Sequence, residues 1–465
     1  HFSNQKKMKV YIVLVLLFTV LYSIQCHESI RIVKNDLDWA PVDKVLQNAI
    51  EDHAFPGAVA AVFDKNGQLY MKAHGYFTYD KKTPMTLNTL FDMASVTKVI
   101  ATTTATARLY QQGFIRLNDR VSDTFPAFSA AGKQNITILN LLLHNSGFPP
   151  DPVPGFWSAS FGCPGSSSYH PKMTFDCLGK LYDGIMQQTL SHPIGEVYVY
   201  SDLSMMTMHL VIGHVVRANN LVSASDLLPS CPSSLPKGSE LCYYEAYVRK
   251  HVVEDAGMDS SIVKFILDDQ EKSKAAPAWN DKSYRHELIQ GVVSDPNAYV
   301  HGGICGHAGL FGTVPEISKL LRLILFRQNP TYLNDATITK FTTVYNTTQS
   351  SRALGWDTNS DGYGSCGSLS PRTYLHLGYT GTQVCSDPDR NIITMLFTNR
   401  VYPDPANIKI RDVRKYFNDA VRHVVDSDAL KELVSKSTTD HVHTKNLQPT
   451  VVRRLTKVLM NVFTF

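Results

Sequence analysis

A serine precedes a lysine by three residues in the segment "TLFDMASVTKVIATTTATARLYQQGF", at Ser95 and Lys98. Residues at positions i and i+3 of a helix share one face, so the hydroxyl and the amine are expected to lie side by side. A serine hydroxyl is a weak nucleophile until a base takes its proton, and a lysine whose ammonium is destabilised by desolvation can be that base. The pair indicates nucleophilic catalysis. The Ser-x-x-Lys spacing also arises by chance in long proteins, so other residues have to support it.

Two further segments carry groups that would complete such a site. Tyr200 lies in "YVYSDLSMMTMHLVIG", a strand-like stretch that opens into a helix. A tyrosine beside a lysine can act there as a second base or acid. The segment "HLGYTGT", from His376 to Thr382, is predicted to lie on a strand, where its glycines allow a substrate backbone to approach closely.

Five segments occur together in a characteristic order: "TLFDMASVTK", "LLLHNSG", "YSDLS", "GGICGHAGLFGT", and "HLGYTGTQVCSDP" followed by "MLFTNRVYP". This set resembles the β-lactamase-related serine hydrolases, which include class C β-lactamases, DD-peptidases and penicillin-binding-protein-like esterases. The resemblance extends from about residue 40 to residue 425 and omits mainly two cysteine-containing loops. Each motif is modest alone, but five in this order and spacing are specific.

The resemblance implies a role for each matching residue. Ser95 would be the acylated nucleophile and Lys98 its base partner, while Tyr200 would share proton transfer with Lys98. The backbone N–H groups of Ser95 and Tyr379 would form the oxyanion hole. Such preorganised donors are often the largest catalytic contribution. No metal and no organic cofactor is expected.

The chain departs from the family's pattern at two positions that bind substrate. Asp202 stands where class C enzymes have Asn, and His376-Leu377-Gly378 stands where they have Lys-Thr-Gly. An unperturbed His376 is mostly neutral near pH 7, and Leu377 has no hydroxyl to bind a carboxylate. We therefore expect hydrolysis of small-molecule ester, amide or peptide substrates rather than strong binding of penicillins or of a D-Ala-D-Ala terminus. If His376 contacts the substrate, anionic substrates should gain rate as the pH falls through the pKa of this histidine.

Other interpretations stay open. A catalytically inactive binding protein on the same fold is one, and a D-Ala-D-Ala carboxypeptidase or β-lactamase proper is another. In "HGGICGHAG", His301, Cys305 and His307 could form a cysteine nucleophile or a metal site. A glycine-rich loop packed near the active site explains this segment better, and it is what the family resemblance implies. His144 is expected to be structural, holding a loop near a helix end.

The hydrophobic pattern predicts the elements that position these residues. "PGAVAAVFDKNGQLYMKAHGYF" is predicted to form two strands joined at Asn66-Gly67, a strong hairpin signal. The Ser95 segment is predicted to form a helix, and residues 114–290 to be mainly helical, with long loops at 149–176 and 222–240. Later elements are a helix "PEISKLLRLILF", strands "TYLHLGYTGTQVC" and "NIITMLFTNR", and a closing helix "FNDAVRHVVD".

Strands near both ends and helices between them indicate the α/β class, more narrowly α+β. We expect an antiparallel sheet built from N- and C-terminal strands and flanked by helices, with a mostly helical second region. The family resemblance implies the β-lactamase/transpeptidase-like form of this architecture.

Cysteine spacing suggests an oxidising compartment. Pairs close in sequence are expected to form disulfides, each of the first two closing a loop rich in Pro, Ser and Gly. The expected pairs are Cys163–Cys177, Cys231–Cys242 and Cys366–Cys385, which leaves Cys305 free. Glycosylation sequons at Asn135 and Asn346 fit a secreted protein.

The first residues of the chain have the features of a targeting signal rather than of a folded domain. The uncharged run from Val10 to Ile24 follows a basic patch; it is short for a membrane span and typical of a signal peptide. We expect a signal peptide at residues 1–26, a hydrolase domain at 40–425 and a tail at 426–465. The alternative is an uncleaved signal anchor. The protein would then be secreted or reside in the lumen of the secretory or lysosomal pathway, with no membrane span after signal removal.

Charge gives no indication of a polyanionic partner. The chain has 45 Lys and Arg against 41 Asp and Glu, a formal net charge of +4. Three of the lysines, Lys6, Lys7 and Lys9, lie in the expected signal peptide, which contains no acid. The nearly neutral remainder predicts neither nucleic acid nor an anionic membrane as partner, and no oligomeric state is predicted.

Overall fold

A computed structural model describes residues 37–165, 168 and 170–443 of the chain. The expected signal peptide, residues 1–26, lies outside these residues. Residues 39–422 form one compact unit. Helix α13 (Ile410–His443) extends beyond the end of this unit.

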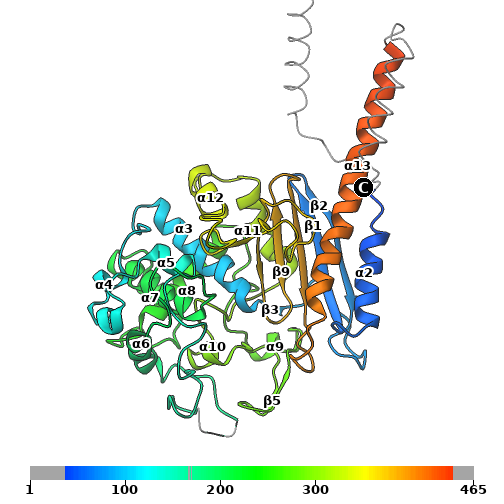
Figure 1. Cartoon of the computed structure of the whole chain (residues 1–465). Helices are drawn as coiled ribbons and strands as arrows, with labels where there is room; N and C mark the ends of the chain where they lie inside the picture. The colour runs from blue at the N-terminus through cyan, green and yellow to red at the C-terminus, as the bar shows by residue number, and fades with distance from the viewer. Residues whose placement is uncertain (1–36, 166–167, 169, 444–465) are drawn as a thin grey trace, which may run out of the picture. The chain divides into compact units, whose positions relative to one another are not determined.

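Six antiparallel strands form the central sheet in the order β2–β1–β10–β9–β8–β7 (Figure 1). Their bounds are β1 (Gly57–Asp64), β2 (Gly67–Gly75), β7 (Asp357–Thr358), β8 (Tyr374–Leu377), β9 (Gln383–Asp387) and β10 (Ile392–Thr398). The N-terminal hairpin joins the C-terminal strands through the pairing of β1 with β10, where Ala58 faces Thr398. This confirms the predicted fold class, an antiparallel sheet made from both ends of the domain.

The predicted hairpin forms at the expected turn. The carboxylate of Asp64 accepts hydrogen bonds from the N–H groups of Asn66 and Gly67, each at 2.8 Å. Gly67 has φ 144°, a conformation that favours glycine. β1 is buried along its whole length because it lies inside the sheet, whereas the edge strand β2 alternates between buried and more exposed residues.

Helices cover both faces of the sheet (Figure 1). α11 (Val314–Leu325) packs against β1, β9 and β10 on one face. It is the helix that the sequence predicts from Pro315. α2 (Ala40–Glu51) lies along β2 on the other face, beside the first turns of α13. On α2, Asp43 accepts hydrogen bonds from Tyr70 and Lys72 of β2, which ties this helix to the edge strand.

α3 (Thr104–Gln111) precedes the region predicted to be mainly helical, residues 114–290. The regular structure of that region is mainly helical, between long loops. Its α-helices are α4 (Val121–Thr124), α5 (Ile138–Leu142), α6 (Leu178–Gln187), α7 (Asp202–Ala218), α8 (Glu240–Tyr247) and α9 (Asp269–Lys272). α7 packs against α5 and α8 and is buried on nearly all sides. It begins at Ser201, whose hydroxyl accepts a hydrogen bond from the N–H of Ser204. A two-stranded ribbon of β4 (Asn280–Asp281) and β5 (Glu287–Leu288), which was not predicted, lies near the end of this region.

The three expected disulfides are present. Their Cα atoms lie 5.5 Å apart in Cys163–Cys177, 5.7 Å in Cys231–Cys242 and 6.3 Å in Cys366–Cys385. The first two close the loops of the helical region, and the third ties a loop to β9. Cys305 is free and buried, as expected.

The Ser95 segment is not the single α-helix that was predicted. It consists of β3 (Phe91–Asp92), a 3₁₀ turn η1 (Ala94–Val96), a π-helical segment η2 (Lys98–Thr103) and then α3. Threonine hydroxyls explain the wider π turns. Thr104 donates to the carbonyl of Val99, five residues earlier, and Thr102 donates to Gly306 O on another segment. Such side-chain bonds compete with the regular α-helical pattern.

Two further predictions need correction. The segment "TYLHLGYTGTQVC" is two strands, β8 and β9, because the N–H of Gly378 donates to Thr382 O at 2.7 Å and closes a turn. The closing helix is longer than predicted, since α13 begins at Ile410 and continues to His443. Of the expected tail, residues 426–443 therefore continue this helix, and residues 444–465 lie outside the described part of the chain.

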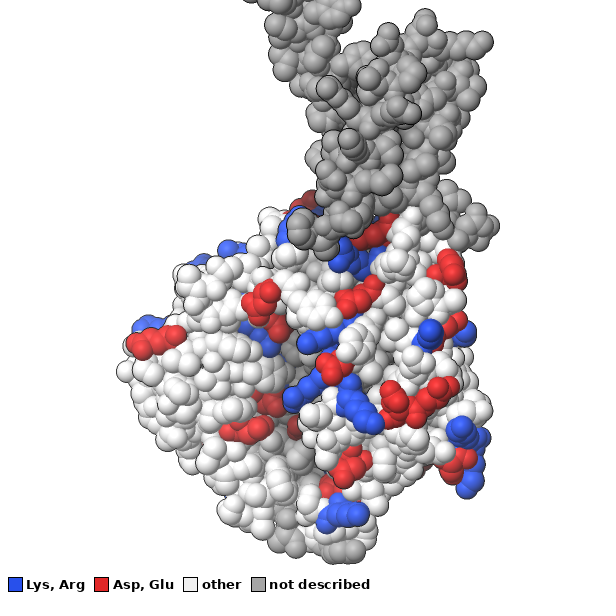
Figure 2. All heavy atoms as spheres, turned by 45° about the vertical axis from the view of Figure 1, so that its right-hand side comes forward, with Lys and Arg blue, Asp and Glu red and all other residues white. Residues whose placement is uncertain are grey.

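No helix in the described ranges is both long enough and apolar enough to cross a membrane. Figure 2 shows one face of the molecule, on which basic and acidic side chains are interspersed. On this face no broad field of one sign is apparent.

Candidate active site

The candidate nucleophile lies on a strained turn. β3 pairs with β6 (Phe311–Gly312), and the chain turns sharply after it, with Ala94 at φ 44° just before Ser95. A positive φ at a non-glycine residue costs about 1–3 kcal/mol and persists only when neighbours hold it. The buried carboxylate of Asp92 supplies that support, because it accepts the N–H of Ala94 at 2.8 Å and the N–H of Ser294 at 2.7 Å. Ser95 is thereby presented at the surface of a fixed turn.

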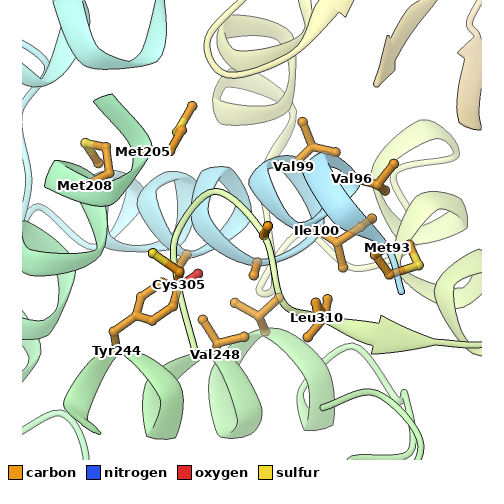
Figure 3. Packing of buried hydrophobic residues seen from close by; sticks show 14 of the residues in the cluster. Met93, Val96, Val99, Ile100, Met205, Met208, Tyr244, Val248, Cys305 and Leu310 are labelled. Atoms are coloured by element: carbon orange, nitrogen blue, oxygen red, sulfur yellow. The ribbon is translucent and has the colours of Figure 1, made fainter. Parts of the chain in front are cut away.

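The segment after Ser95 lies in the middle of the hydrophobic core (Figure 3). Met205 and Met208 of α7 flank it on one side, and Tyr244 of α8 and Val248 lie on another. Val99 and Ile100 have no exposed surface. A segment packed this way cannot shift without opening the core, so Lys98 is held in place relative to Ser95.

Lys98 is fully buried among polar groups. Its Nζ donates to Ser95 Oγ at 2.8 Å and to His307 O at 2.9 Å, and it lies 2.6 Å from Asp202 Oδ1. Asp202 is the first residue of α7, so the helix start that was predicted at this point brings the carboxylate to the lysine.

The charge state of Lys98 differs from the expectation. Burial alone would lower the pKa of Lys98, but the charges of Asp202 and Tyr200 and their hydrogen bonds to the ammonium raise this pKa above its usual value. Lys98 is therefore an ammonium in the resting protein rather than a desolvated free amine. It can stabilise negative charge on its neighbours, but it is not ready to accept a proton from Ser95.

Tyr200 lies between two cations. The Nζ of Lys98 is 5.0 Å from the centre of its ring, and the guanidinium carbon of Arg352 is 5.2 Å away. The rings of His144 and His376 lie 4.8 Å and 6.1 Å from it. Burial holds the pKa of each histidine well below its usual value, so both are neutral neighbours. The phenol of Tyr200 therefore has two cationic neighbours and no charged histidine beside it.

His144 has the structural role expected for it. Its Nδ1 accepts a hydrogen bond from the N–H of Ser201 at 3.1 Å, next to Tyr200. The backbone of His144 is held at φ 54° at the end of α5. This histidine fixes the stretch that carries Tyr200 to the start of α7.

The β8–β9 turn faces the nucleophile from the central sheet. His376 is buried at the end of β8, with Nδ1 3.0 Å from Leu377 O. A Cβ on Gly378 would lie 2.6 Å from Met93 O and 2.0 Å from Thr382 Oγ1. Position 378 therefore requires glycine because a side chain there would collide with the protein itself, just before Ser95 in the chain. The sequence suggested instead that this glycine makes room for an approaching substrate.

A pocket of about 580 Å³ lies in front of Ser95. Four arginines line it, against a single acid: Arg352, Arg400, Arg411 and Arg414, with Asp357. The other lining residues are Ser95, Tyr200, His376, Leu377, Gly378, Tyr379, Pro405, Ile408 and Ile410. The pocket therefore combines the candidate nucleophile, positive charge and apolar side chains.

A second set of ionisable groups lies behind Lys98. His307 is buried, with Nε2 2.9 Å from Asp295 Oδ1 and Nδ1 3.2 Å from Cys305 Sγ. Although burial opposes it, the charges of Cys305 and Asp295 raise the pKa of His307 well above its usual value. Asp202, Asp295 and His307 offer ligand atoms within 4.8 Å of one another. Each of the two carboxylates is already paired with a cation of the protein, Lys98 or His307.

Most sequence-predicted site residues meet in one place. Ser95, Lys98, Tyr200 and Asp202 lie together as the candidate reactive centre, and His376, Gly378 and Tyr379 line the pocket. Sequence reasoning missed the pocket arginines and Asp295. Arg400 lies in the quoted segment "MLFTNRVYP" but was given no role, and the others lie in loops or on α13 outside the quoted motifs. Only the folded chain shows that these residues lie near Ser95.

The charge of His376 leads to an expectation opposite to the one from sequence. Because its pKa is lowered well below 6.5, His376 stays neutral from pH 6.5 to 8, while the arginines stay charged. The ratio of kcat/KM for p-nitrophenyl hemisuccinate, an anionic ester, to that for neutral p-nitrophenyl butyrate should change by less than about twofold over this range. A ratio that rises steadily as the pH falls towards 6.5 would contradict this prediction and would indicate that protonated His376 binds the anionic ester.

Comparison with known proteins gives a consistent result. A family model described as "Beta-lactamase" matches residues 42–417. A protein of Salmonella enteritidis PT4 named "Putative D-alanyl-D-alanine carboxypeptidase" is 28% identical over 398 residues, covering 79% of this chain and 84% of that protein.

Solved structures share the fold at lower identity. EstCE1, described as a hydrolase with promiscuous acyltransferase activity, aligns with a TM-score of 0.60 and 20% identity over 81% of this chain and 97% of its own. A penicillin-binding protein homologue from Caulobacter crescentus aligns with a TM-score of 0.59 and 18% identity, over 83% and 97% of the two chains. At these identities the similarity establishes the fold alone.

Proposed function

Because this chain belongs to the beta-lactamase family, whose members are serine hydrolases, we propose that it hydrolyses ester, amide or peptide substrates through an acyl-enzyme at Ser95. One observation supports this most directly. Ser95 Oγ accepts a hydrogen bond from the buried ammonium of Lys98 at 2.8 Å and opens onto the arginine-lined pocket. A binding protein on the same fold would have no need of this arrangement.

Acylation follows from the charges at the site. The substrate carbonyl would enter the pocket with its oxygen towards the N–H groups of Ser95 and Tyr379. Since Lys98 is already protonated, the step requires Tyr200 as the phenolate, with the Lys98 ammonium beside it. The phenolate takes the proton of Ser95 Oγ as this oxygen bonds to the carbonyl carbon. Lys98 stabilises the charge on Tyr200 and stays protonated. Tyr200 then returns the proton to the leaving alcohol or amine, which departs as the acyl-enzyme forms.

Deacylation repeats these steps with water. Water attacks the acyl carbon, Tyr200 accepts its proton, and the same two N–H groups stabilise the oxyanion. The bond from the acyl carbon to Ser95 Oγ breaks, and Tyr200 returns the proton to Ser95. A carboxylic acid leaves, and the resting site is restored.

The pocket favours substrates with an anionic group. Nη1 of Arg352 is buried and has no hydrogen-bond partner in the described part of the chain, and Arg411 is exposed at the pocket. These guanidinium groups supply the permanent positive charge that neutral His376 cannot. This observation supports a second candidate activity, cleavage of a peptide that ends in a free carboxylate, such as the D-Ala-D-Ala terminus suggested by the name of the Salmonella relative.

Turnover measurements test both activities. Purified protein should release p-nitrophenol from p-nitrophenyl butyrate, and an N-acyl-D-Ala-D-Ala peptide should be compared with its C-terminal amide. Hydrolysis of the acid but not of the amide would establish the carboxypeptidase, and ester hydrolysis alone the esterase. No turnover of any of the three would leave the binding protein as the better interpretation.

Exposed sequons and disulfides support secretion, which we also propose. Asn135 and Asn346 are exposed, so both can accept a glycan. Disulfides persist in oxidising compartments, and three are present among the described residues. N-terminal sequencing of the mature protein tests this proposal. A chain that begins near His27 supports it, whereas a retained N-terminal segment supports the anchor.

Asp202→Asn should change the pH dependence of the reaction. Without this carboxylate the pKa of Lys98 should fall, because Asp202 raises it in the native site. If Lys98 acts as a cation, kcat/KM should decline at a lower alkaline pH in the variant, by about one unit or more. If Lys98 were the proton acceptor, the variant would instead gain activity near neutral pH. Complete pH profiles of both proteins distinguish the two roles.

A further inference from the structure

The proposed oxyanion hole depends on the direction of one peptide unit. The N–H of Tyr379 and the carbonyl of Gly378 belong to the same peptide, and this peptide is trans. In a trans peptide the N–H and the carbonyl point in opposite directions. Any group that holds Gly378 O therefore also sets the direction of the Tyr379 N–H.

Arg414 is that group. It lies on α13, near its start, and only 7% of the residue is exposed. Its Nη2 donates to Gly378 O at 2.8 Å and to Thr382 O at 2.9 Å. Thr382 O also accepts the N–H of Gly378, so one nitrogen of Arg414 holds both ends of the β8–β9 turn.

Further side-chain hydrogen bonds hold the rest of the β8–β9 turn. Arg400 Nε donates to Tyr379 O at 2.8 Å, which fixes the next peptide. The hydroxyl of Thr380 donates to Asp92 O, and that of Thr382 donates to Met93 O, just before Ser95. The two N–H groups of the proposed oxyanion hole are thus fixed relative to each other by side-chain bonds.

Stability alone does not account for Arg414. No carboxylate of the described residues lies within ion-pair distance of it, and its Nε has no hydrogen-bond partner there. Burial, with Arg400 nearby, lowers the pKa of Arg414 to about 9. A buried guanidinium without an anion is unfavourable, and an apolar residue of similar size would often be more stable at such a place.

We propose that Arg414 is a positioning residue, which aims the N–H of Tyr379 at the substrate oxyanion by holding the carbonyl of Gly378. The inference rests on the proposed function, since it assumes acyl transfer at Ser95. Arg414 acts here through the backbone and does not itself contact the reacting atoms. Its loss should therefore reduce kcat and leave KM nearly unchanged, whatever the charge of the substrate.

Arg414→Gln and Arg414→Lys test this role with p-nitrophenyl butyrate and p-nitrophenyl hemisuccinate. Loss of one oxyanion donor costs about 10²–10³ in rate, so Arg414→Gln should lower kcat about 10²-fold for both esters. Arg414→Lys retains a charged donor and should recover part of this loss. Lys415→Met is the matched control, because it removes the cation of the next residue on α13, outside the pocket, and should retain wild-type kcat.

The outcomes separate the inference from the function on which it rests. Wild-type kcat in a folded Arg414→Gln protein would overturn the inference. A higher KM for the anionic ester alone would also overturn it, because Arg414 would then bind the substrate's charge. If the wild type hydrolyses neither the esters nor the N-acyl-D-Ala-D-Ala peptide, the proposed function fails instead. If it hydrolyses the peptide alone, kcat of the same variants is measured with that peptide and the same outcomes decide. Should Arg414→Gln not fold, Thr380→Val removes the bond to Asp92 O and should lower kcat about tenfold, and unchanged kcat in that variant would count against the inference.

Discussion

Ser95→Ala is expected to lower kcat for ester hydrolysis at least about 10⁴-fold, because loss of the nucleophile of a serine hydrolase removes up to about 10⁶ in kcat. The reason is specific to this site. Besides Ser95, the hydroxyl that hydrogen-bonds to Lys98 among the described residues is the phenol of Tyr200, which is the proposed proton acceptor and not a second serine or threonine nucleophile. Initial rates with p-nitrophenyl butyrate, at enzyme concentrations high enough to measure residual turnover, give the result.

The structure also predicts that this variant folds normally. Within the part of the chain that the structure describes, Ser95 Oγ takes part only in the bond from Lys98. Asp92 supports the turn through the N–H of Ala94, which the substitution leaves in place. The melting temperature should therefore stay close to that of the wild type. Activity within tenfold of the wild type in the folded variant would contradict the assignment of Ser95 as nucleophile.

Lys98→Met is expected to have the second largest effect, with kcat at least about 10³-fold lower. Methionine has nearly the length of lysine and suits the buried site, but it supplies no charge to support Tyr200. The variant also leaves the carboxylate of Asp202 without its partner. Removing one member of a buried ion pair costs about 3–5 kcal/mol, so the free energy of unfolding should also fall.

A double variant separates catalysis from stability. In Lys98→Met with Asp202→Asn, the uncompensated carboxylate is gone, so much of the lost free energy of unfolding should return. Activity should remain as low as in Lys98→Met. Urea unfolding and ester hydrolysis measured on the same preparations decide the matter. Recovery of activity along with stability would show that Lys98 has only a structural role.

The parts of the fold that depend on local signals were predictable. Asn66-Gly67 predicted the hairpin because few other dipeptides adopt that turn, and the short cysteine spacings predicted all three disulfides. The proximity of Ser95 and Lys98 was also predictable. The π-helical turns after them were not, because they depend on hydrogen bonds such as that from Thr102 to Gly306, 204 residues away in sequence.

The charge states of the site residues could be assigned only from the folded structure. The sequence suggested a desolvated, neutral Lys98, but the carboxylate of Asp202 lies 2.6 Å away and makes the lysine an ammonium. Arg352 and Arg414 reach the pocket from segments far from any motif. Their places depend on long-range packing of loops and of α13, which no local pattern in the sequence specifies.

The central claim is that Ser95 is an activated nucleophile, and intact-mass spectrometry after treatment with a fluorophosphonate probe tests it most directly. The account predicts a single adduct on the wild-type protein, absent from Ser95→Ala and located by peptide mapping on the segment that contains Ser95. An adduct that persists in Ser95→Ala, or a folded wild type that gains none, would contradict it.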